Sequence, residues 1–155
     1  MRSEDMKRTM TPGGEAAGKL IYEVLRLHGR LIAAGDALMA DLGLSSARWQ
    51  VLGTVAASGR PLTVPDLSRI LGQSRQSLQR LVNEMVGDGL LRFTDNPGHR
   101  RSPFVEPTEA GRLLHVEVEA RRIPWTEGIA SRLGDVDTLA AVRTLARLRA
   151  VLERG

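Results

Sequence analysis

The sequence predicts a mainly helical α+β fold, and three observations lead to that prediction. Apolar residues at helical spacing mark a short stretch between Thr63 and Gly72 and a second one between Ser74 and Gly89. A basic, hairpin-like segment follows and ends at Arg101. Longer helical patterns stand at both ends of the chain. Two closely joined helices followed by such a hairpin are typical of a winged helix-turn-helix.

The first short helix has clear start and stop signals. Thr63 is a suitable N-cap, Pro65 is tolerated in a first turn, and Asp66 places a negative charge where the helix dipole favours it. Gly72 can adopt the left-handed geometry that ends many helices. The helix is therefore predicted to stop at Gly72, with the next helix following almost at once.

The second short helix has one apolar face and one polar face. Ser74 is a suitable N-cap, and the apolar residues recur at the three-and-four spacing of a buried face. No acidic residue occurs from Leu67 through Asn83. The polar stripe on the opposite face consists of Arg75, Gln76, Gln79, Arg80 and Asn83.

This polar stripe suits the reading of DNA bases. Arginine can donate two hydrogen bonds to guanine, and glutamine and asparagine can pair with adenine. The first residues of the second helix are normally those nearest to base edges. An ordinary solvated helix face is the plainer alternative, and the basic hairpin that follows favours DNA binding over it.

The hairpin is a candidate wing. Leu90–Thr94 and Ser102–Glu106 are the predicted strands, and Asn, Pro and Gly between them supply turn chemistry. Arg100 and Arg101 lie where the tip returns to the sheet, so we expect them to contact phosphates or a narrow minor groove. Two arginines alone would also fit an ordinary basic turn. Their position after the reading helix favours DNA contact.

Composition limits the class of protein. With 155 residues the chain fits one integrated domain, preceded by an expected disordered tail at residues 1–14. The 22 basic and 18 acidic residues give a net charge of +4. The absence of cysteine excludes disulfides, thiolate nucleophiles and Cys-based zinc sites. No membrane-spanning run or apolar signal core is evident, so a cytoplasmic location is expected, on the nucleoid when DNA is bound.

Amphipathic helices are predicted on both sides of the helix-turn-helix. These helical patterns run from Gly18 to Leu42, from Ser45 to Gly59, from Thr108 onward, and from Asp135 or Asp137 to near the end. A bend or a break is expected at Pro124, because proline removes a backbone donor.

The helices at the chain ends exceed what one helix-turn-helix needs for cover, and this surplus predicts a homodimer. Residues 15–44 and 108–155 are the expected dimerisation helices, and residues 45–107 are the expected DNA-binding lobe. Two reading helices related by a two-fold axis would meet a palindromic operator. Its half-site centres would be roughly 10 base pairs apart.

Four motifs occur in a characteristic order: Leu44–Leu52, Thr63–Gly72, Asp88–Leu91 and Thr108–Arg112. Together they resemble the MarR (multiple-antibiotic-resistance regulator) family of bacterial transcription factors, roughly over residues 15–152. The resemblance implies an obligate homodimer whose first, fifth and sixth helices form the dimer layer. It also implies regulation, most often repression, that is relieved by small ligands bound between the dimer layer and the DNA lobe.

Carried over by position, the resemblance assigns DNA contacts. It places Gln73, Ser74, Arg75, Gln76 and Ser77, with Gln79 and Arg80, at the major groove, and Arg100 or Arg101 at the minor groove or backbone. Two features depart from the family. Gly98 and His99 replace the first Arg and second Asp of its Asp-x-Arg-Asp-x-Arg wing pattern, which removes an acidic brace. Pro107 replaces a usual Leu, so the second wing strand is expected to end early.

Few residues indicate a ligand or catalytic site. Trp49 and Trp125 are candidates to wall a pocket for a small aromatic or phenolic effector, although core packing is the favoured interpretation for Trp49. His28 and His115 would approach each other if the first and fifth helices pack together, and a satisfied interface histidine is the plainer alternative. No spacing indicates a metal site, a cofactor or a catalytic triad, so no enzyme is predicted.

These features together predict a sequence-specific DNA-binding transcriptional regulator. We expect a repressor whose DNA binding is modulated by a small-molecule effector. The alternative is a winged-helix protein-interaction or antirepressor module that does not bind DNA. The acid-free polar stripe and the two wing arginines argue against this alternative.

Overall fold

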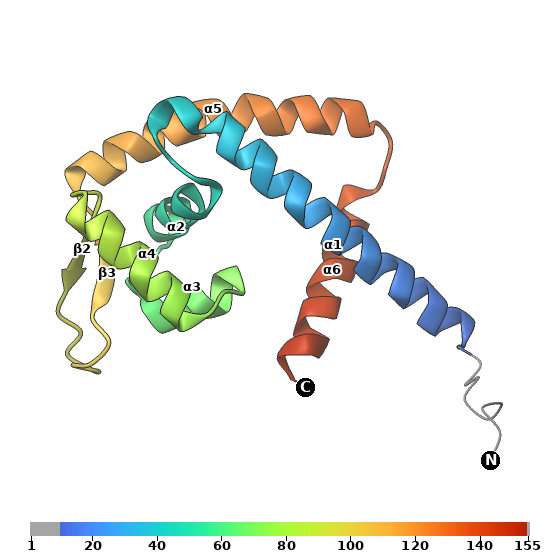
Figure 1. Cartoon of the computed structure of the whole chain (residues 1–155), viewed down its shortest axis with the longest axis horizontal. Helices are drawn as coiled ribbons and strands as arrows, with labels where there is room; N and C mark the ends of the chain where they lie inside the picture. The colour runs from blue at the N-terminus through green and yellow to red at the C-terminus, as the bar shows by residue number, and fades with distance from the viewer. Residues whose placement is uncertain (1–9, 155) are drawn as a thin grey trace, which may run out of the picture. The chain divides into compact units, whose positions relative to one another are not determined.

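A computed structural model describes residues 10–154 of the chain (Figure 1). In chain order its elements are α1 (Pro12–Leu38), the 3₁₀ turn η1 (Ala40–Leu42), α2 (Ser46–Ala57), β1 (Leu62–Thr63), α3 (Val64–Leu71), α4 (Arg75–Gly87), β2 (Leu91–Thr94), β3 (Phe104–Pro107), α5 (Glu109–Leu133) and α6 (Thr138–Glu153). The predicted order of two short helices and a hairpin is confirmed, because α3 and α4 are followed directly by β2 and β3.

Helix α1 begins earlier than the sequence analysis predicted. The expected disordered tail covered residues 1–14, but the helix already begins at Pro12. The Thr11 hydroxyl caps it by accepting a hydrogen bond from the Gly14 N–H at 3.1 Å, and proline suits the first helical position. The tail assignment is therefore wrong where it overlaps the helix, and residues 1–9 lie outside the described part.

The chain divides into two compact units, with the boundary between Glu119 and Ala120 inside α5. The second unit contains the rest of α5 and α6. Asp137 caps α6, as predicted for one of two candidate positions, by accepting a hydrogen bond from the Ala140 N–H at 2.8 Å. Within residues 10–154 no helix combines the length and apolar character needed to cross a bilayer.

Helix α5 stays helical through Pro124, so the predicted alternative of a break is wrong. Proline removes one backbone donor from the helix. The Thr126 hydroxyl lies in the same turn and donates to the carbonyls of Arg122 and Ile123, at 2.9 Å each. The N–H that Pro124 lacks would donate to the Ala120 carbonyl, so the Thr126 hydroxyl adds contacts to the neighbouring carbonyls but does not replace this donor.

A three-stranded antiparallel sheet of order β1-β3-β2 carries the hairpin. Strand β2 pairs with β3 from Leu91 opposite Pro107 to Thr94 opposite Phe104, and β1 pairs with the other edge of β3. The main core lies where this sheet meets α2, α3 and α4. Its buried members are Val51, Leu52, Val55, Leu62, Val64, Leu67, Leu78, Val82, Met85, Leu91 and Val105. This core fixes α4 and the hairpin in one lobe.

The predicted early end of the second wing strand is also wrong. Strand β3 extends to Pro107, which lies opposite the first residue of β2. The Thr108 N–H donates to the Leu90 carbonyl at 3.1 Å, and the alternation of an antiparallel ladder turns the Pro107 nitrogen away from β2. Strand β1 pairs with Phe104 and Val105 but not with this position, so the proline removes no ladder hydrogen bond.

A smaller apolar cluster joins the end of α1 to the first half of α5. Its buried members are Met39, Leu44 and Val118. Near it, Gly35 of α1 lies against α2 so closely that an added Cβ would stand 2.7 Å from the Ser46 hydroxyl oxygen. The missing side chain lets α1 and α2 pack together at this point.

Candidate nucleic-acid interface

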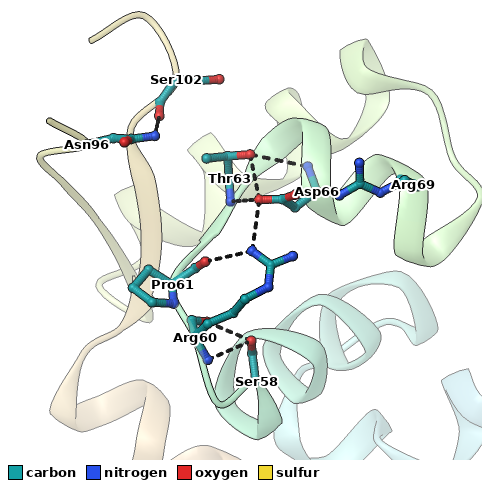
Figure 2. A network of polar contacts seen from close by, with 8 residues as sticks. All are labelled: Ser58, Arg60, Pro61, Thr63, Asp66, Arg69, Asn96 and Ser102. Atoms are coloured by element: carbon teal, nitrogen blue, oxygen red, sulfur yellow. Dashed lines mark hydrogen bonds and ion pairs between the residues drawn. The ribbon is translucent and has the colours of Figure 1, made fainter. Parts of the chain in front are cut away.

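Helix α3 begins with a reciprocal cap between Thr63 and Asp66 (Figure 2). The Asp66 N–H donates to the Thr63 hydroxyl at 3.3 Å, and the Thr63 N–H donates back to the Asp66 carboxylate at 3.0 Å. This capping box confirms the predicted start of the helix and fixes the chain that enters it from β1.

The carboxylate of Asp66 also faces two cations. The guanidinium groups of Arg69 and Arg60 lie 2.6 Å and 3.5 Å from its oxygens (Figure 2). The hydrogen bond from the Thr63 N–H lowers the pKa of Asp66 most, and the Thr63 hydroxyl and Arg60 add to this, outweighing the opposite effect of partial burial. Asp66 is therefore a charged brace between the β1 entry and α3.

The turn between α3 and α4 sets the start of α4. Gly72 has φ +65°, which confirms the predicted left-handed helix end. The Ser68 hydroxyl donates to the Gln73 carbonyl at 2.6 Å. Ser74 then caps α4 by accepting a hydrogen bond from the Ser77 N–H at 3.1 Å. These contacts hold the N-terminal end of α4 against α3.

Helix α4 buries one face and exposes the other. Leu78, Val82 and Met85 are buried in the main core. Ser74 and Ser77 are exposed at its start, whereas Gln73 is half-buried. The exposed residues on the face away from the core, called the outer stripe below, are Arg75, Gln76, Gln79, Arg80 and Asn83. The structure thus brings together the polar side chains that the sequence placed on one stripe.

Contacts within the outer stripe involve its C-terminal half. The Gln79 amide donates to the Asn83 side-chain oxygen at 3.0 Å. The Arg80 Nε lies 3.7 Å from the carboxylate of Glu84. Glu84 is not among the residues predicted from the sequence, although its spacing of four residues from Arg80 indicates the pair. Both groups are exposed, so this ion pair is weak and does not neutralise the stripe.

The loop of the wing, residues 95–103, is closed by its own hydrogen bonds. The Asn96 amide donates to the Ser102 carbonyl at 2.8 Å (Figure 2). The His99 N–H donates to the Asn96 carbonyl at 3.0 Å, and the Ser102 N–H donates to the His99 carbonyl at 2.9 Å. The sequence indicated that an acidic brace is missing at His99. Asn96 braces the loop instead, a role the sequence analysis did not assign.

The two wing arginines, Arg100 and Arg101, are exposed in this loop. Arg100 lines an open hollow together with Asp95, Asn96, Pro97 and Pro103. At the base of the hairpin, Arg92 of β2 pairs with Glu106 of β3 at 3.1 Å. Since β2 contacts α4, the wing and the outer stripe belong to the same lobe.

The four residues considered for an effector pocket have different surroundings. His28 is exposed on α1, and Trp125 is half-buried in the second half of α5. The Trp49 indole nitrogen lies 3.2 Å from where a Cβ on Gly35 would stand, and His115 lies against α2. The Nε1 atom of Trp49 and the Nδ1 atom of His115 are buried and have no hydrogen-bond partner among residues 10–154. The same residues contain no group of three His, Asp or Glu that could hold a metal ion.

Comparison with known proteins decides the family. The family model described as MarR family matches residues 42–102, from the end of η1 into the wing loop. The chain is 32% identical over 143 residues to the transcriptional activatory protein BadR of Rhodopseudomonas palustris, covering 90% of this chain and 79% of BadR. The chain belongs to the MarR family.

Further relatives and structures agree with this assignment. An uncharacterized protein of Mycobacterium tuberculosis, Rv2011c, is 38% identical over 135 residues, or 86% of this chain and 90% of the relative. The Staphylococcus aureus MepR–DNA complex has a TM-score of 0.73 at 15% identity, covering 84% of this chain and 96% of MepR. NadR in complex with 4-hydroxyphenylacetate has a TM-score of 0.72 at 20% identity, covering 83% of this chain and 90% of NadR. These two structures share the fold.

Membership of the MarR family makes this chain a DNA-binding transcriptional regulator and not an enzyme. The predicted fold, a mainly helical winged helix with long N- and C-terminal helices, is confirmed. The resemblance drawn from the four sequence motifs is confirmed with it.

Proposed function

We propose that this MarR-family protein binds a palindromic operator as a homodimer, with α4 in the major groove. The observation that carries the proposal is the outer stripe, which lies opposite core residues such as Leu78 and Val82 that are 0% exposed. Within residues 10–154 neither Arg75 nor Gln76 makes a side-chain hydrogen bond or ion pair. Both side chains are free to donate to base edges, Arg75 to guanine and Gln76 to adenine.

The remaining site residues would complete the contact with DNA. Gln79 and Asn83 would present their amides as a hydrogen-bonded pair, and Arg80 would contact a base or a phosphate. Ser74 and Ser77 would face phosphates at the N-terminal end of α4, beside Gln73, where the helix dipole favours anions.

The wing would bind DNA without reading its sequence. Arg100 and Arg101 are exposed, and the Asn96 brace holds the loop that carries them. Guanidinium groups on such a loop fit phosphates or a narrow minor groove. The wing would therefore add affinity and salt dependence, whereas the outer stripe would add specificity.

A homodimer would cover apolar side chains that one chain leaves exposed. In α1 these side chains are Ile21, Tyr22, Val24, Leu25, Leu27 and Leu31. In α6 they are Leu139, Val142, Leu145, Val151 and Leu152. Burial of apolar surface contributes about 25 cal/mol per Å², so both helices favour association with a second copy. The dimerisation segments remain those proposed from the sequence, residues 15–44 and 108–155.

A small aromatic or phenolic effector would modulate DNA binding. Buried polar groups normally have partners, and the unpaired nitrogens of Trp49 and His115 lie on α2 and α5, in the compact unit that also carries α4. NadR, which shares the fold, is a precedent for a phenolic ligand. A phenol or carboxylate oxygen would accept the hydrogen that the Trp49 indole donates.

We propose repression as the regulatory outcome, because a dimer seated on promoter DNA would exclude the transcription machinery. Activation is a second candidate, since the 32% identical relative BadR is named an activator. Transcript levels of the neighbouring genes, measured with and without this protein, separate the two. A rise on deletion supports repression, and a fall identifies activation.

The proposed function is tested by a shift assay with the DNA upstream of the protein's own gene at two salt concentrations. The wild-type protein should bind this DNA more tightly than random DNA of equal length. The change Arg75→Ala should cost about 1–3 kcal/mol and relax the sequence preference. Equal operator affinity of Arg75→Ala and wild type would refute the assignment. Absence of DNA binding at both salt concentrations would instead favour an interaction or antirepressor module.

A further inference from the structure

An ion pair ties the C-terminal end of α4 to α2. Arg48 lies in the first turn of α2, and its guanidinium group pairs with the carboxylate of Asp88. Asp88 is the C-cap of α4, and its N–H donates to the Glu84 carbonyl at 2.9 Å. The ion pair thus joins the C-cap residue of α4 to the first turn of α2.

Arg48 depends on Asp88 for its charge balance. The Arg48 side chain is only 22% exposed, and its Nε is buried without a hydrogen-bond partner in the described part of the chain. Among residues 10–154, Asp88 is the one acidic group within ion-pair distance of Arg48. Removing Asp88 leaves the largely buried Arg48 charge without a counter-ion, whereas the Asp88 side chain is 55% exposed and its carboxylate stays solvated when Arg48 is removed.

Thr108, the residue immediately before α5, holds the two residues that follow Asp88. The Thr108 hydroxyl donates to the Gly89 carbonyl at 2.6 Å, and the Thr108 N–H donates to the Leu90 carbonyl at 3.1 Å. The C-cap of α4 and the two residues after it are therefore held by polar contacts from α2 and from the residue that precedes α5. These contacts lie at the opposite end of the helix from Arg75 and Gln76, whose side chains make no hydrogen bond or ion pair with any residue of the described range 10–154.

We propose that Arg48 is a positioning residue for DNA recognition, which sets the tilt of α4 through Asp88. This proposal rests on the proposed function, in which the outer stripe reads the operator. Helix α4 has 13 residues, which corresponds to a length of about 20 Å. A rotation of roughly 10° about its C-terminal end would move Arg75 by roughly 3 Å.

Such a displacement affects the two kinds of DNA contact differently. A direct hydrogen bond to a base edge tolerates only a few tenths of an ångström. Contacts of long cationic side chains with phosphates adapt more easily, because they depend on charge more than on geometry. Loss of the Arg48–Asp88 pair should therefore weaken operator recognition more than general DNA affinity.

The test compares Asp88→Asn with the wild-type full chain on two duplexes of equal length, the upstream DNA of its own gene and a random sequence. The change keeps the size of the side chain and removes the ion pair. It also makes the net charge more positive, which by itself strengthens binding to any DNA. We expect operator binding to weaken about tenfold, while binding to random DNA stays equal or tightens.

Two matched variants separate geometry from charge. The double change Arg48→Gln with Asp88→Asn restores the wild-type net charge and should weaken operator binding by a similar factor, about tenfold. Glu109→Gln carries the same charge change as Asp88→Asn, at an exposed ion pair with Arg112 of 3.0 Å, and should leave operator binding at least as strong as in the wild type. Thermal unfolding of the double variant, which leaves no unpaired guanidinium, and of Glu109→Gln should remain close to that of the wild type, whereas Asp88→Asn should unfold at a lower temperature.

Wild-type operator affinity in both Asp88→Asn and the double variant would overturn the positioning role. An equal fall in affinity for both duplexes, together with a lower unfolding temperature, would also overturn it, because that result indicates a purely structural pair. If the wild-type protein itself fails to distinguish the two duplexes, the proposed function fails and this proposal fails with it. Failure of the proposed function is thus visible in the binding of the wild-type protein to the two duplexes, before any variant is measured.

Discussion

The Cα of Gly111 in α5 lies directly against the carbonyl oxygen of Leu90. A Cβ built on Gly111 would stand 2.1 Å from that oxygen and 3.1 Å from the carbonyl carbon. The same oxygen accepts hydrogen bonds from the N–H and the hydroxyl of Thr108, at 3.1 Å and 3.2 Å. The start of α5 can therefore cross the entry to β2 only where no side chain intervenes.

The change Gly111→Ala should destabilise the protein. The group that the new methyl meets is backbone, so it cannot rotate away as a flexible side chain would. We expect the free energy of unfolding to fall by about 1–3 kcal/mol, as for other overpacked sites, measured by chemical denaturation at fixed protein concentration. Gly87→Ala is the matched control, because Gly87 is helical and a Cβ there meets no atom within 4 Å. An equal effect of the two changes would contradict the close approach.

The lowered pKa of Asp66 predicts that the protein loses stability as the pH falls into the acid range. Its pKa in the folded protein lies below the ordinary value of 3.8, so the cap contributes stability that is present above that value. This contribution is lost as the pH falls through the folded pKa. Asp66→Asn keeps an acceptor for the Thr63 N–H but removes the charge that faces Arg60 and Arg69.

The free energy of unfolding of Asp66→Asn should be about 0.5–1.5 kcal/mol lower than that of the wild type at neutral pH. The gap should shrink in acid, because the wild-type carboxyl group then becomes neutral too. Denaturation curves at neutral pH and below the ordinary pKa of the carboxyl group measure both gaps. A gap of equal size in the two conditions would show that the charge of Asp66 does not stabilise the helix start.

The brace at Asn96 should control the wing. Asn96→Ala removes the hydrogen bond to the Ser102 carbonyl, which contributes about 1 kcal/mol locally. Because the loop lies outside the core, global stability should change little. Amide exchange in the wing loop should become faster, and affinity should fall by a similar factor, about threefold to tenfold, for operator and random DNA. Unchanged exchange at the His99 and Ser102 amides would mean that the side chain does not hold the loop.

The exposed apolar side chains of α6 should form part of the dimer interface. The double change Val142→Glu with Leu145→Glu places charges among apolar side chains that are exposed in the single chain. Sedimentation at micromolar concentration should show a dimer for the wild type and a monomer for the variant, with operator affinity lost in parallel. Arg147→Gln is a control on the same helix that should remain dimeric. A wild-type protein that sediments as a monomer would rule out the dimer.

Short-range chemistry made the helix-turn-helix predictable from the sequence. Thr63, Gly72 and Ser74 each act on atoms within a few residues, and all three cap the helices as expected. The helical period likewise placed the outer stripe of α4 opposite the core. The family resemblance followed from these local motifs and their spacing.

Other features depend on relations that spacing along the chain does not reveal. Pro107 was expected to end its strand, but its effect depends on which side of the ladder its nitrogen faces. The pair of Arg48 and Asp88 joins residues 40 positions apart, so no local pattern indicates it. The Asn96 brace depends on the path of the loop between the strands rather than on residue type alone.

Selection of binding sites from a pool of random DNA duplexes tests the central claim most directly. If α4 reads an operator in a two-fold dimer, the wild-type protein should enrich a palindrome with half-site centres roughly 10 base pairs apart. Arg75→Ala should bind the same pool with a weakened preference at one base of each half-site. Enrichment of no palindrome by the wild type, or of the same motif with equal strength by Arg75→Ala, would contradict this account.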